Sequence, residues 1–559
     1  QPGQVLFAPI SRKRGDVKAR SKTYANGAAP IRARPAKGKG TAMQTNLHIA
    51  DLGRTNKCSR RIFLKGAGTV AIATGAILWG CAPRSEQGEG SSESKVPTTW
   101  DEETDVVIVG GGGAGTSAAL AAAEAGASVI VLEKSAMTGG STALCGQAIM
   151  GVGTSVQKEA GIEDSVEEAM KYFSEVGDGR EDLVRFVVEH SAEAVEWLID
   201  LGMEVPAVIG NPGLVFGGQE KERADLTAPV MRTHYATQPN PGLWPVLQKA
   251  LDNEENVDVR TNTPATALVQ NPQTGEVLGV MAGEKGETAI KARKGVVLAA
   301  GGYARNPDMM RALISRHEVQ TTANEGDTGD GMNLGLSAGC GAGYFGMLSN
   351  VQYSKPISPC AFIVLGPDTM EGKPPFICVN MKGERWSNER KFYSYICDDL
   401  LKQPEGRAFV LTCGNEGLTG LGKAADEAYK ADTLTDLAGQ MGVDADTLSA
   451  TVEQWNAGCA QGTDAQFGRE SELYPLERGP YYAAEVKPGC ASTFGGITVD
   501  TDMRAIAAVT GQPIGRLYAA GMNSMALGRF YPTCGAAVAT AITTGRQAGA
   551  NVAGESAWE

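Results

Sequence analysis

The stretch "TDVVIVGGGGAGTSAALAAAEAGASVIVLEK", residues 104–134, decides the fold class. Its pattern is strand, glycine turn, helix, strand, with strands predicted at 106–109 and 128–132 and an alanine-rich helix at 116–125. This arrangement within about thirty residues is typical of a dinucleotide-binding βαβ unit. The sequence therefore predicts an α/β protein that opens with a Rossmann-like domain.

The glycine spacing in this stretch has a chemical reason. Gly110, Gly112 and Gly115 form the pattern G-x-G-x-x-G. The first glycine allows a tight turn, the second lets the backbone approach a pyrophosphate at the helix N-terminus, and the third allows close helix–strand packing. Glu133 ends the second strand, where its carboxylate can accept hydrogen bonds from ribose hydroxyls. Together these residues predict a bound dinucleotide.

Composition narrows the class of protein further. A length of 559 residues favours two or three domains, and the 72 glycines follow no fibrous period. The 11 cysteines form no CxxC or CxxCH, and the 4 histidines lack metal-ligand spacing. These patterns argue against an iron–sulfur cluster, a covalent haem or a metal site in this chain. The net charge of −13 disfavours nucleic acid as a partner.

The first hundred residues are typical of an export signal. "SRRIFLK" at 59–65 carries paired arginines, and the apolar run that follows is too short and glycine-rich for a membrane span. Cys81 resembles a lipobox cysteine, so a lipid anchor there is left open. We expect twin-arginine export to the periplasm or cell envelope. The predicted N-terminal segments are upstream or disordered sequence at 1–42, a signal peptide at 43–82 and a linker at 83–103.

Three later stretches carry a resemblance that bears on the identity of the dinucleotide. "MTGGSTALCGQ" (137–147), "GVVLAAGG" (295–302) and "TGDGMNLGLSAG" (328–339) follow the βαβ unit. Over about 104–555 the chain resembles the flavoprotein subunits of fumarate reductase and succinate dehydrogenase. The resemblance implies FAD, bound non-covalently because the histidine of covalent members is absent near 137–147. It also implies these cofactor-binding residues: Gly110, Gly112, Ala114, Gly115, Glu133, Lys134, Gly139, Gly140, Ser141, Thr142, Gly146, Gln147, Gly301, Asp330, Gly521, Asn523, Ala536 and Val538.

The same resemblance implies two interlocked domains. A glutathione-reductase-type FAD-binding domain spans 104–350 and 490–559, and an α+β capping domain at 351–489 interrupts it. In the family, substrate lies between the two.

The family's charged substrate-binding positions are neutral here. Ser354 and Ser492 stand where two substrate histidines are expected, and Tyr393 stands four residues after the N-E motif in place of an arginine. Tyr531-Pro532 replaces a further arginine. A dicarboxylate needs paired cations once it is desolvated, so these replacements disfavour fumarate and succinate. Arg529 is the cation that could reverse this interpretation, and Tyr353 is a further substrate-binding candidate.

A second resemblance points to a ketone. "AAGMNSMALGRFYPTCGAAVATAITTG" (519–545) is similar to the C-terminal motif of 3-ketosteroid dehydrogenases. This resemblance implies that the Tyr531 hydroxyl and the Gly535 N–H polarise a ketone, while Tyr393 exchanges a proton with the substrate.

The favoured function is therefore an exported enone reductase that transfers hydride between flavin N5 and an activated C=C bond, with a steroid-like substrate as one candidate. No second dinucleotide motif is seen, so electrons are expected from a cytochrome or quinol-linked membrane partner. The alternatives are the reverse 3-ketosteroid dehydrogenation, an organic-acid reductase of urocanate, cinnamate or fumarate type, and a non-catalytic FAD-binding lipoprotein.

Overall fold

The computed structural model describes residues 96–176, 178–205, 207–209, 230–236, 242–354, 375–391, 393–529 and 531–559, all within one compact unit. The predicted segments 1–42 and 43–82, with Cys81, lie outside the described residues, as does most of 83–103. Among the helices that are described, none has the length and apolar character needed to cross a membrane.

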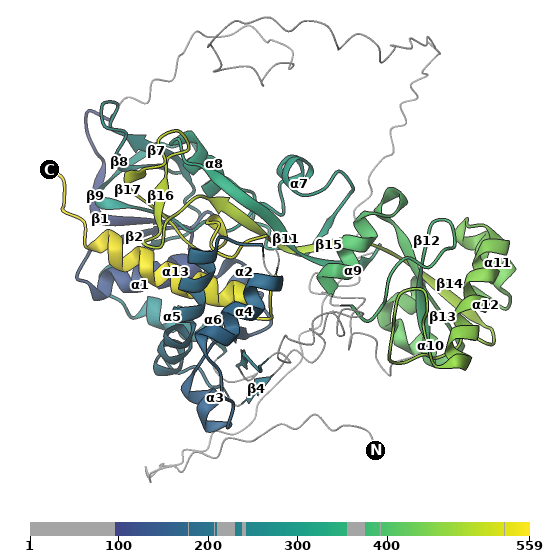
Figure 1. The fold of residues 1–559 in the computed structure, drawn as a ribbon. Helices are drawn as coiled ribbons and strands as arrows, with labels where there is room; N and C mark the ends of the chain where they lie inside the picture. The colour runs from purple at the N-terminus through teal and green to yellow at the C-terminus, as the bar shows by residue number, and fades with distance from the viewer. Residues whose placement is uncertain are drawn as a thin grey trace, which may run out of the picture. The chain divides into compact units, whose positions relative to one another are not determined.

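A mainly parallel sheet forms the centre of the FAD-binding domain (Figure 1). Its order is β16-β17-β9-β1-β2-β6, and β1 pairs in parallel with both β2 and β9. The predicted α/β fold of the Rossmann type is confirmed. The strands span β1 (Glu102–Val109), β2 (Val129–Leu132), β6 (Val257–Arg260), β9 (Thr288–Leu298), β16 (Arg504–Ile506) and β17 (Pro513–Ala519); the antiparallel hairpin β7 (Ala265–Gln270) and β8 (Val277–Ala282) joins the sheet at β9.

Two helices made of small residues run side by side in this domain (Figure 1). They are α1 (Gly113–Glu124) and α13 (Ala536–Ala553). Their backbones approach closely: a Cβ added at Gly549 would lie 2.1 Å from the Ala118 carbonyl oxygen. Because α1 begins at the glycine turn, this packing helps to fix the position of the turn.

Further described elements of this domain are eight helices and a smaller sheet. The helices are α2 (Gly140–Ala143), α3 (Ser155–Glu159), α4 (Val166–Val176), α5 (Glu181–Asp200), α6 (Leu243–Asp252), α7 (Pro307–Leu313), α8 (Asp330–Ser337) and the short η3 (Gly521–Asn523). A separate three-stranded sheet has the order β3-β5-β4, with β3 (Ala148–Met150), β4 (Ala207–Ile209) and β5 (Thr233–Tyr235).

Another sheet runs from the FAD-binding part of the chain into the predicted capping domain, which also has a small core of its own. The sheet order is β10-β15-β13-β12, and β11 and β14 also pair with β15. Ile377, Phe409, Leu411 and Trp455 pack together in that core. The elements are β10 (Gln320–Thr321), β11 (Ala342–Tyr353), β12 (Phe376–Asn380), β13 (Ala408–Cys413), β14 (Tyr429–Ala431), β15 (Tyr481–Ile497), α9 (Tyr393–Leu401), α10 (Gly414–Gly420), α11 (Leu434–Met441), α12 (Ala445–Gln461), η1 (Pro404–Gly406) and η2 (Gly422–Glu427).

The structure differs from several predicted boundaries. β1 begins at Glu102, and Trp100 packs edge-on against Trp558 with ring centroids 6.1 Å apart, so residues 100–103 belong to the folded domain rather than to a linker. β11 and β15 are paired strands that continue across the predicted domain limits at 350/351 and 489/490, since pairing does not stop at a change of domain. The first helix begins at Gly113, three residues before its predicted start.

Candidate active site

The glycine turn leaves no room for a side chain at its first and third glycines. Gly110 has φ +104°, and a Cβ there would lie 2.5 Å from the Ala299 carbonyl oxygen. At Gly115 a Cβ would lie 1.8 Å from the Gly110 carbonyl oxygen. Gly112 forms an isolated parallel bridge with Gly139, which joins the two glycine loops. The space in front of α1 is therefore bounded by backbone.

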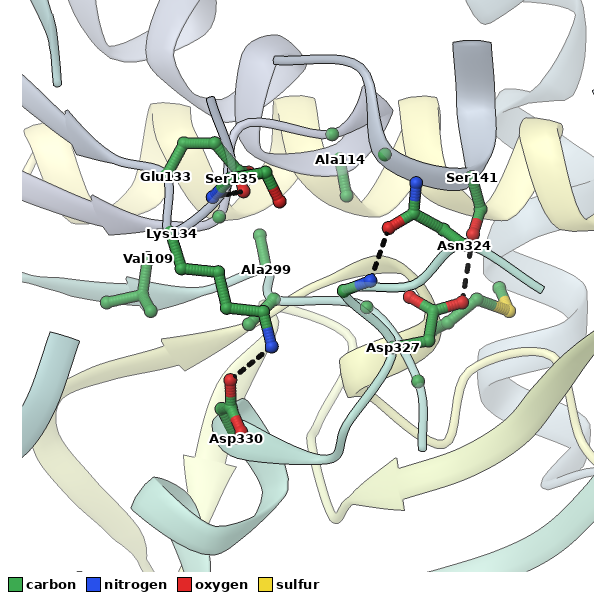
Figure 2. A pocket seen from close by; sticks show the side chains of 18 of the residues that line it. Val109, Ala114, Glu133, Lys134, Ser135, Ser141, Ala299, Asn324, Asp327 and Asp330 are labelled. Atoms are coloured by element: carbon green, nitrogen blue, oxygen red, sulfur yellow. Dashed lines mark hydrogen bonds and ion pairs between the residues drawn. The ribbon is translucent and has the colours of Figure 1, made fainter. Parts of the chain in front are cut away.

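A cavity of about 850 Å³, including its open mouth, lies at these loops (Figure 2). Ten of the predicted cofactor residues line it: Gly110, Gly112, Ala114, Glu133, Lys134, Gly140, Ser141, Thr142, Gly301 and Asp330. The other lining residues, which the sequence analysis did not select as cofactor ligands, include Ser135, Ala299, Ala300, Gly302, Asn324, Gly326, Asp327, Ser492, Met522 and Ala541.

Glu133 is held at the end of β2 by backbone donors. The Gly111 N–H donates to its Oε2 at 2.9 Å and the Ser135 N–H donates to its Oε1 at 2.7 Å. The adjacent Lys134 extends to Asp330, with 2.5 Å between Nζ and Oδ2, as Figure 2 shows. Two residues that are neighbours in sequence thus offer an acceptor and a cation to the same cavity.

Asp327 is a cavity residue that sequence reasoning missed. Ser141 Oγ donates to its Oδ2 at 2.9 Å, and the side chain is buried (Figure 2). Burial raises the pKa of this carboxyl group. The signal was present in the sequence, because the glycine-rich "EGDTGDG" (325–331) contains three acids, of which only Asp330 was predicted to bind the cofactor.

A buried amide tests whether FAD fits this cavity. Asn523 Oδ1 accepts a hydrogen bond from the Ala300 N–H at 3.0 Å, but its Nδ2 is buried without a partner. An unpaired buried donor is costly, so this atom requires an acceptor. Its neighbours Met522 and Ala300 line the cavity. The unpaired amide, the closed glycine turn and the acid after β2 fit FAD, which carries a pyrophosphate, a ribose and a flavin ring with acceptor atoms.

Eight predicted cofactor residues do not line the cavity. Gly115 and Gly139 shape the glycine loops, and Gly521 and Asn523 flank Met522. The Gln147 side chain instead accepts a hydrogen bond from the Leu243 N–H at 2.8 Å, at the start of α6. The full set of eight is Gly115, Gly139, Gly146, Gln147, Gly521, Asn523, Ala536 and Val538.

Tyr531 and Gly535 are brought together, in a different arrangement from the predicted pair of parallel donors. The Gly535 N–H donates to Tyr531 Oη at 2.8 Å. The tyrosine ring stacks on Phe494, with ring centroids 5.7 Å apart. Burial holds the pKa of Tyr531 well above its usual range, so the hydroxyl stays protonated. The glycine amide therefore polarises the hydroxyl, and the hydroxyl keeps one hydrogen to donate.

The predicted substrate residues lie on different elements. Ser492 lines the cofactor cavity, and Tyr353 ends β11. The Ser354 N–H donates to the Glu485 carbonyl oxygen at 2.9 Å, and the Ser354 carbonyl oxygen accepts from Gln320 Nε2 at 2.6 Å.

Arg529 and Tyr393 are the two remaining predicted site residues. Arg529 is half exposed and pairs with Asp178, with 3.2 Å between Nε and Oδ2, so its cation is partly neutralised. Tyr393 begins α9, but its side chain lies outside the described residues.

Comparison with known proteins identifies the class. The model of the FAD binding domain family matches residues 105–538. The chain belongs to this family.

Curated relatives are reductases. The digoxin reductase of Eggerthella lenta is 31% identical, over 89% of this chain and 98% of the relative. The urocanate reductase of the same organism is also 31% identical, over 77% of this chain and 71% of the relative.

Two solved oxidoreductase structures are also similar to this chain. An open flavocytochrome c3 fumarate reductase is 27% identical with a TM-score of 0.63, over 81% of this chain and 78% of that one. The 3-ketosteroid-Δ4-(5α)-dehydrogenase of Rhodococcus jostii, solved with 4-androstene-3,17-dione, is 26% identical with a TM-score of 0.65, over 82% and 98%. This chain is a FAD-dependent oxidoreductase of the fumarate reductase group that acts on carbon–carbon double bonds.

Proposed function

We propose that this chain is an exported reductase of α,β-unsaturated carbonyl compounds and that its substrate is neutral. A steroid-like enone is the leading candidate. Bound FAD would supply the hydride. The protein's task is then to hold the substrate carbonyl, to stabilise the negative charge that develops on its oxygen and to protonate the second carbon.

The observation that carries this proposal is the Gly535 N–H to Tyr531 Oη hydrogen bond of 2.8 Å. A hydroxyl that accepts from an amide becomes a better donor through its own hydrogen. Burial keeps Tyr531 neutral, and Phe494 fixes its ring. A neutral, fixed donor suits the oxygen of a ketone, whose charge develops only in the transition state. Tyr393, by its place after the N-E motif, is assigned the proton transfer.

The charges at the predicted substrate positions support a neutral substrate. Arg529 pairs with Asp178, and Ser354 and Ser492 are uncharged. Desolvating a dicarboxylate against such groups would be costly. An organic acid is the second candidate substrate, because one relative is a urocanate reductase. Arg529 is the only residue proposed to bind its carboxylate. The likeness to a dehydrogenase solved with a steroid dione favours a ketosteroid and also keeps the oxidative direction as an alternative.

Export and the electron source complete the proposal. The paired Arg60 and Arg61 indicate transport of the folded protein, and NADH is not expected outside the cytoplasmic membrane. No CxxCH is present in the sequence, so a separate cytochrome or a quinol-oxidising membrane protein would deliver electrons. The likeness to a flavocytochrome c3 fumarate reductase supports a haem protein as donor.

The proposal is tested with the purified holoprotein reduced anaerobically by a viologen dye. Reoxidation is followed with 4-androstene-3,17-dione, urocanate, cinnamate and fumarate. The steroid enone should be turned over fastest. Tyr531→Phe should lower kcat for it by about 10²–10³, the usual effect of losing one oxyanion donor.

Tyr518→Phe is the matched control, because Tyr518, on β17, is also a buried tyrosine. Its hydroxyl donates to Glu555 Oε1 at 2.8 Å. This variant should keep wild-type turnover. Fumarate turnover as fast as that of the enone, or a fully active Tyr531→Phe protein, would contradict the proposal. Reduction of an electron acceptor dye by a saturated 3-ketosteroid, with no enone reduction, would instead establish the dehydrogenase alternative.

A further inference from the structure

β5 places a tyrosine beside the turn that carries Tyr531. Successive side chains of a strand point to opposite faces. His234 is fully buried on one face, with its Nε2 2.7 Å from Thr154 Oγ1. Thr233 and Tyr235 share the other face, and Thr233 Oγ1 donates to the Cys534 carbonyl oxygen at 3.2 Å. The face that bears Tyr235 is therefore turned toward residues 531–535.

Neighbouring contacts keep Tyr235 at this turn. β3 pairs with β5, with Ala148 opposite Tyr235, and the Met150 N–H donates to the Gly535 carbonyl oxygen at 3.2 Å. A Cβ built on Gly146 would lie 3.8 Å from Tyr235 Oη. Tyr235 thus lies between the loop that follows α2 and the turn that holds Tyr531.

This tyrosine is much more exposed than its neighbour on the same face of the strand. Thr233, on the same strand face, is 1% exposed, whereas Tyr235 is 40% exposed. Leu144, in the adjoining loop, is 50% exposed. Among the described residues, the Tyr235 hydroxyl has no hydrogen-bond partner. Exposed large apolar side chains that gather beside a candidate catalytic group are typical of a ligand-binding wall.

In the part of the chain that the structure describes, the side chains around Tyr235 and Leu144 that could carry a charge are neutral or paired. Burial raises the pKa of the Cys145 thiol and raises that of Cys534 to about 11, so both thiols are neutral at pH 7. The arginines nearest in sequence to Tyr235 and Tyr531 each form an ion pair with an aspartate. Arg232 meets Asp164 at 2.7 Å and Arg529 meets Asp178 at 3.2 Å.

We propose that Tyr235 contacts the substrate and determines its class: its ring covers one face of a neutral, ring-containing enone whose carbonyl is held by Tyr531, and its hydroxyl donates to a second polar group of that molecule. The proposal rests on the proposed function. It assigns selectivity for flat ring systems to β5 of the FAD-binding domain, outside the predicted capping segment.

The test compares Tyr235→Ala, Tyr235→Phe and Tyr429→Ala in the FAD-loaded protein. Tyr429 is a matched control, since it is 37% exposed and lies on another three-residue strand, β14. Binding of 4-androstene-3,17-dione is titrated through the change in the visible flavin spectrum, and KM and kcat are measured separately. Tyr235→Ala should raise Kd and KM at least tenfold with kcat changed less, Tyr235→Phe should raise them about threefold, and Tyr429→Ala should leave them unchanged.

The two proposals fail in different ways. A wild-type protein that neither binds nor reduces neutral enones overturns the proposed function and this inference with it. A wild-type protein that reduces the steroid enone, together with a Tyr235→Ala variant of unchanged Kd and KM, overturns this inference alone. Unchanged binding by Tyr235→Phe with a tenfold loss in Tyr235→Ala removes the role of the hydroxyl and keeps that of the ring.

Discussion

His234 is buried in the small sheet formed by β3, β5 and β4, where both of its ring nitrogens are bonded. Nδ1 lies 2.9 Å from the Arg232 carbonyl oxygen, so it carries the hydrogen, and Nε2 accepts from the Thr154 hydroxyl. Burial lowers the pKa of His234 to about 4. These contacts give His234 a structural role.

This histidine predicts a pH dependence of stability. Its folded pKa of about 4 lies below the ordinary value near 6.5, so the unfolded chain binds the extra proton between these pH values. The contribution of neutral His234 to the free energy of unfolding is complete above pH 6.5 and is lost as pH falls toward 4. The loss is on the order of 3 kcal/mol. The free energy of unfolding by urea at pH 7 and pH 5 measures this change.

Substitution isolates the contribution of His234. His234→Gln should be less stable than wild type at pH 7 and should lose less stability between pH 7 and pH 5. His190→Gln is the control, because His190 stacks on Phe186 at the surface of α5, with ring centroids 4.4 Å apart. A His234→Gln protein with the full wild-type slope would refute the assignment.

At the scale of elements, the contact between α1 and α13 positions the glycine turn. Gly549 faces the Ala118 carbonyl oxygen, and an added Cβ would lie 2.1 Å away. Backbone atoms cannot move aside as a flexible side chain can, so Gly549→Ala forces the helices apart. We expect a loss of about 1–3 kcal/mol in unfolding free energy and weaker FAD retention, measured by thermal unfolding and by flavin content after dialysis.

Gly439 in α11 provides the opposite case. A Cβ there would meet no atom within 4 Å, so Gly439→Ala should stabilise its helix by up to about 1 kcal/mol. Equal effects of the two alanine substitutions would show that helix propensity, and not the close approach of α1 and α13, governs Gly549.

At the scale of the whole molecule, export of the folded holoprotein can be tested in cells. Arg60→Lys with Arg61→Lys should leave the protein in the cytoplasmic fraction, with its FAD bound and its dye-linked activity intact. Arg32→Lys with Arg34→Lys, in the segment predicted to lie upstream of the signal, is the control and should be exported normally. Fractionation and immunodetection measure the distribution. Export of the Arg60/Arg61 variant at the wild-type level would refute the signal assignment.

The sequence predicted the parts of this protein that depend on local backbone geometry. Gly110, Gly112 and Gly115 could be assigned to a turn because their spacing reflects steric limits within a few residues. Glu133 could be placed at the same cavity because it ends the next strand of the unit. Other predicted residues that line the same cavity, such as Ser141, Gly301 and Asp330, came from the resemblance to flavoprotein subunits and not from local geometry.

Residues far apart in the chain were harder to place. Asp327 lies almost two hundred residues after Ser141 and bonds to it, yet no short motif relates them. The strand limits at β11 and β15 were also missed, because composition does not change where two domains share a pair of strands.

The sequence by itself determined the dinucleotide-binding fold, because that fold follows from residue type and short spacing, and its resemblance to flavoprotein subunits indicated FAD. Only the tertiary structure decided that the Gly535 N–H meets the Tyr531 hydroxyl, that Arg529 turns to Asp178 and that Tyr235 lies exposed beside them. The reason is physical: the direction of a side chain or an amide outside regular structure depends on which partners the fold brings near it, and those partners come from distant parts of the chain.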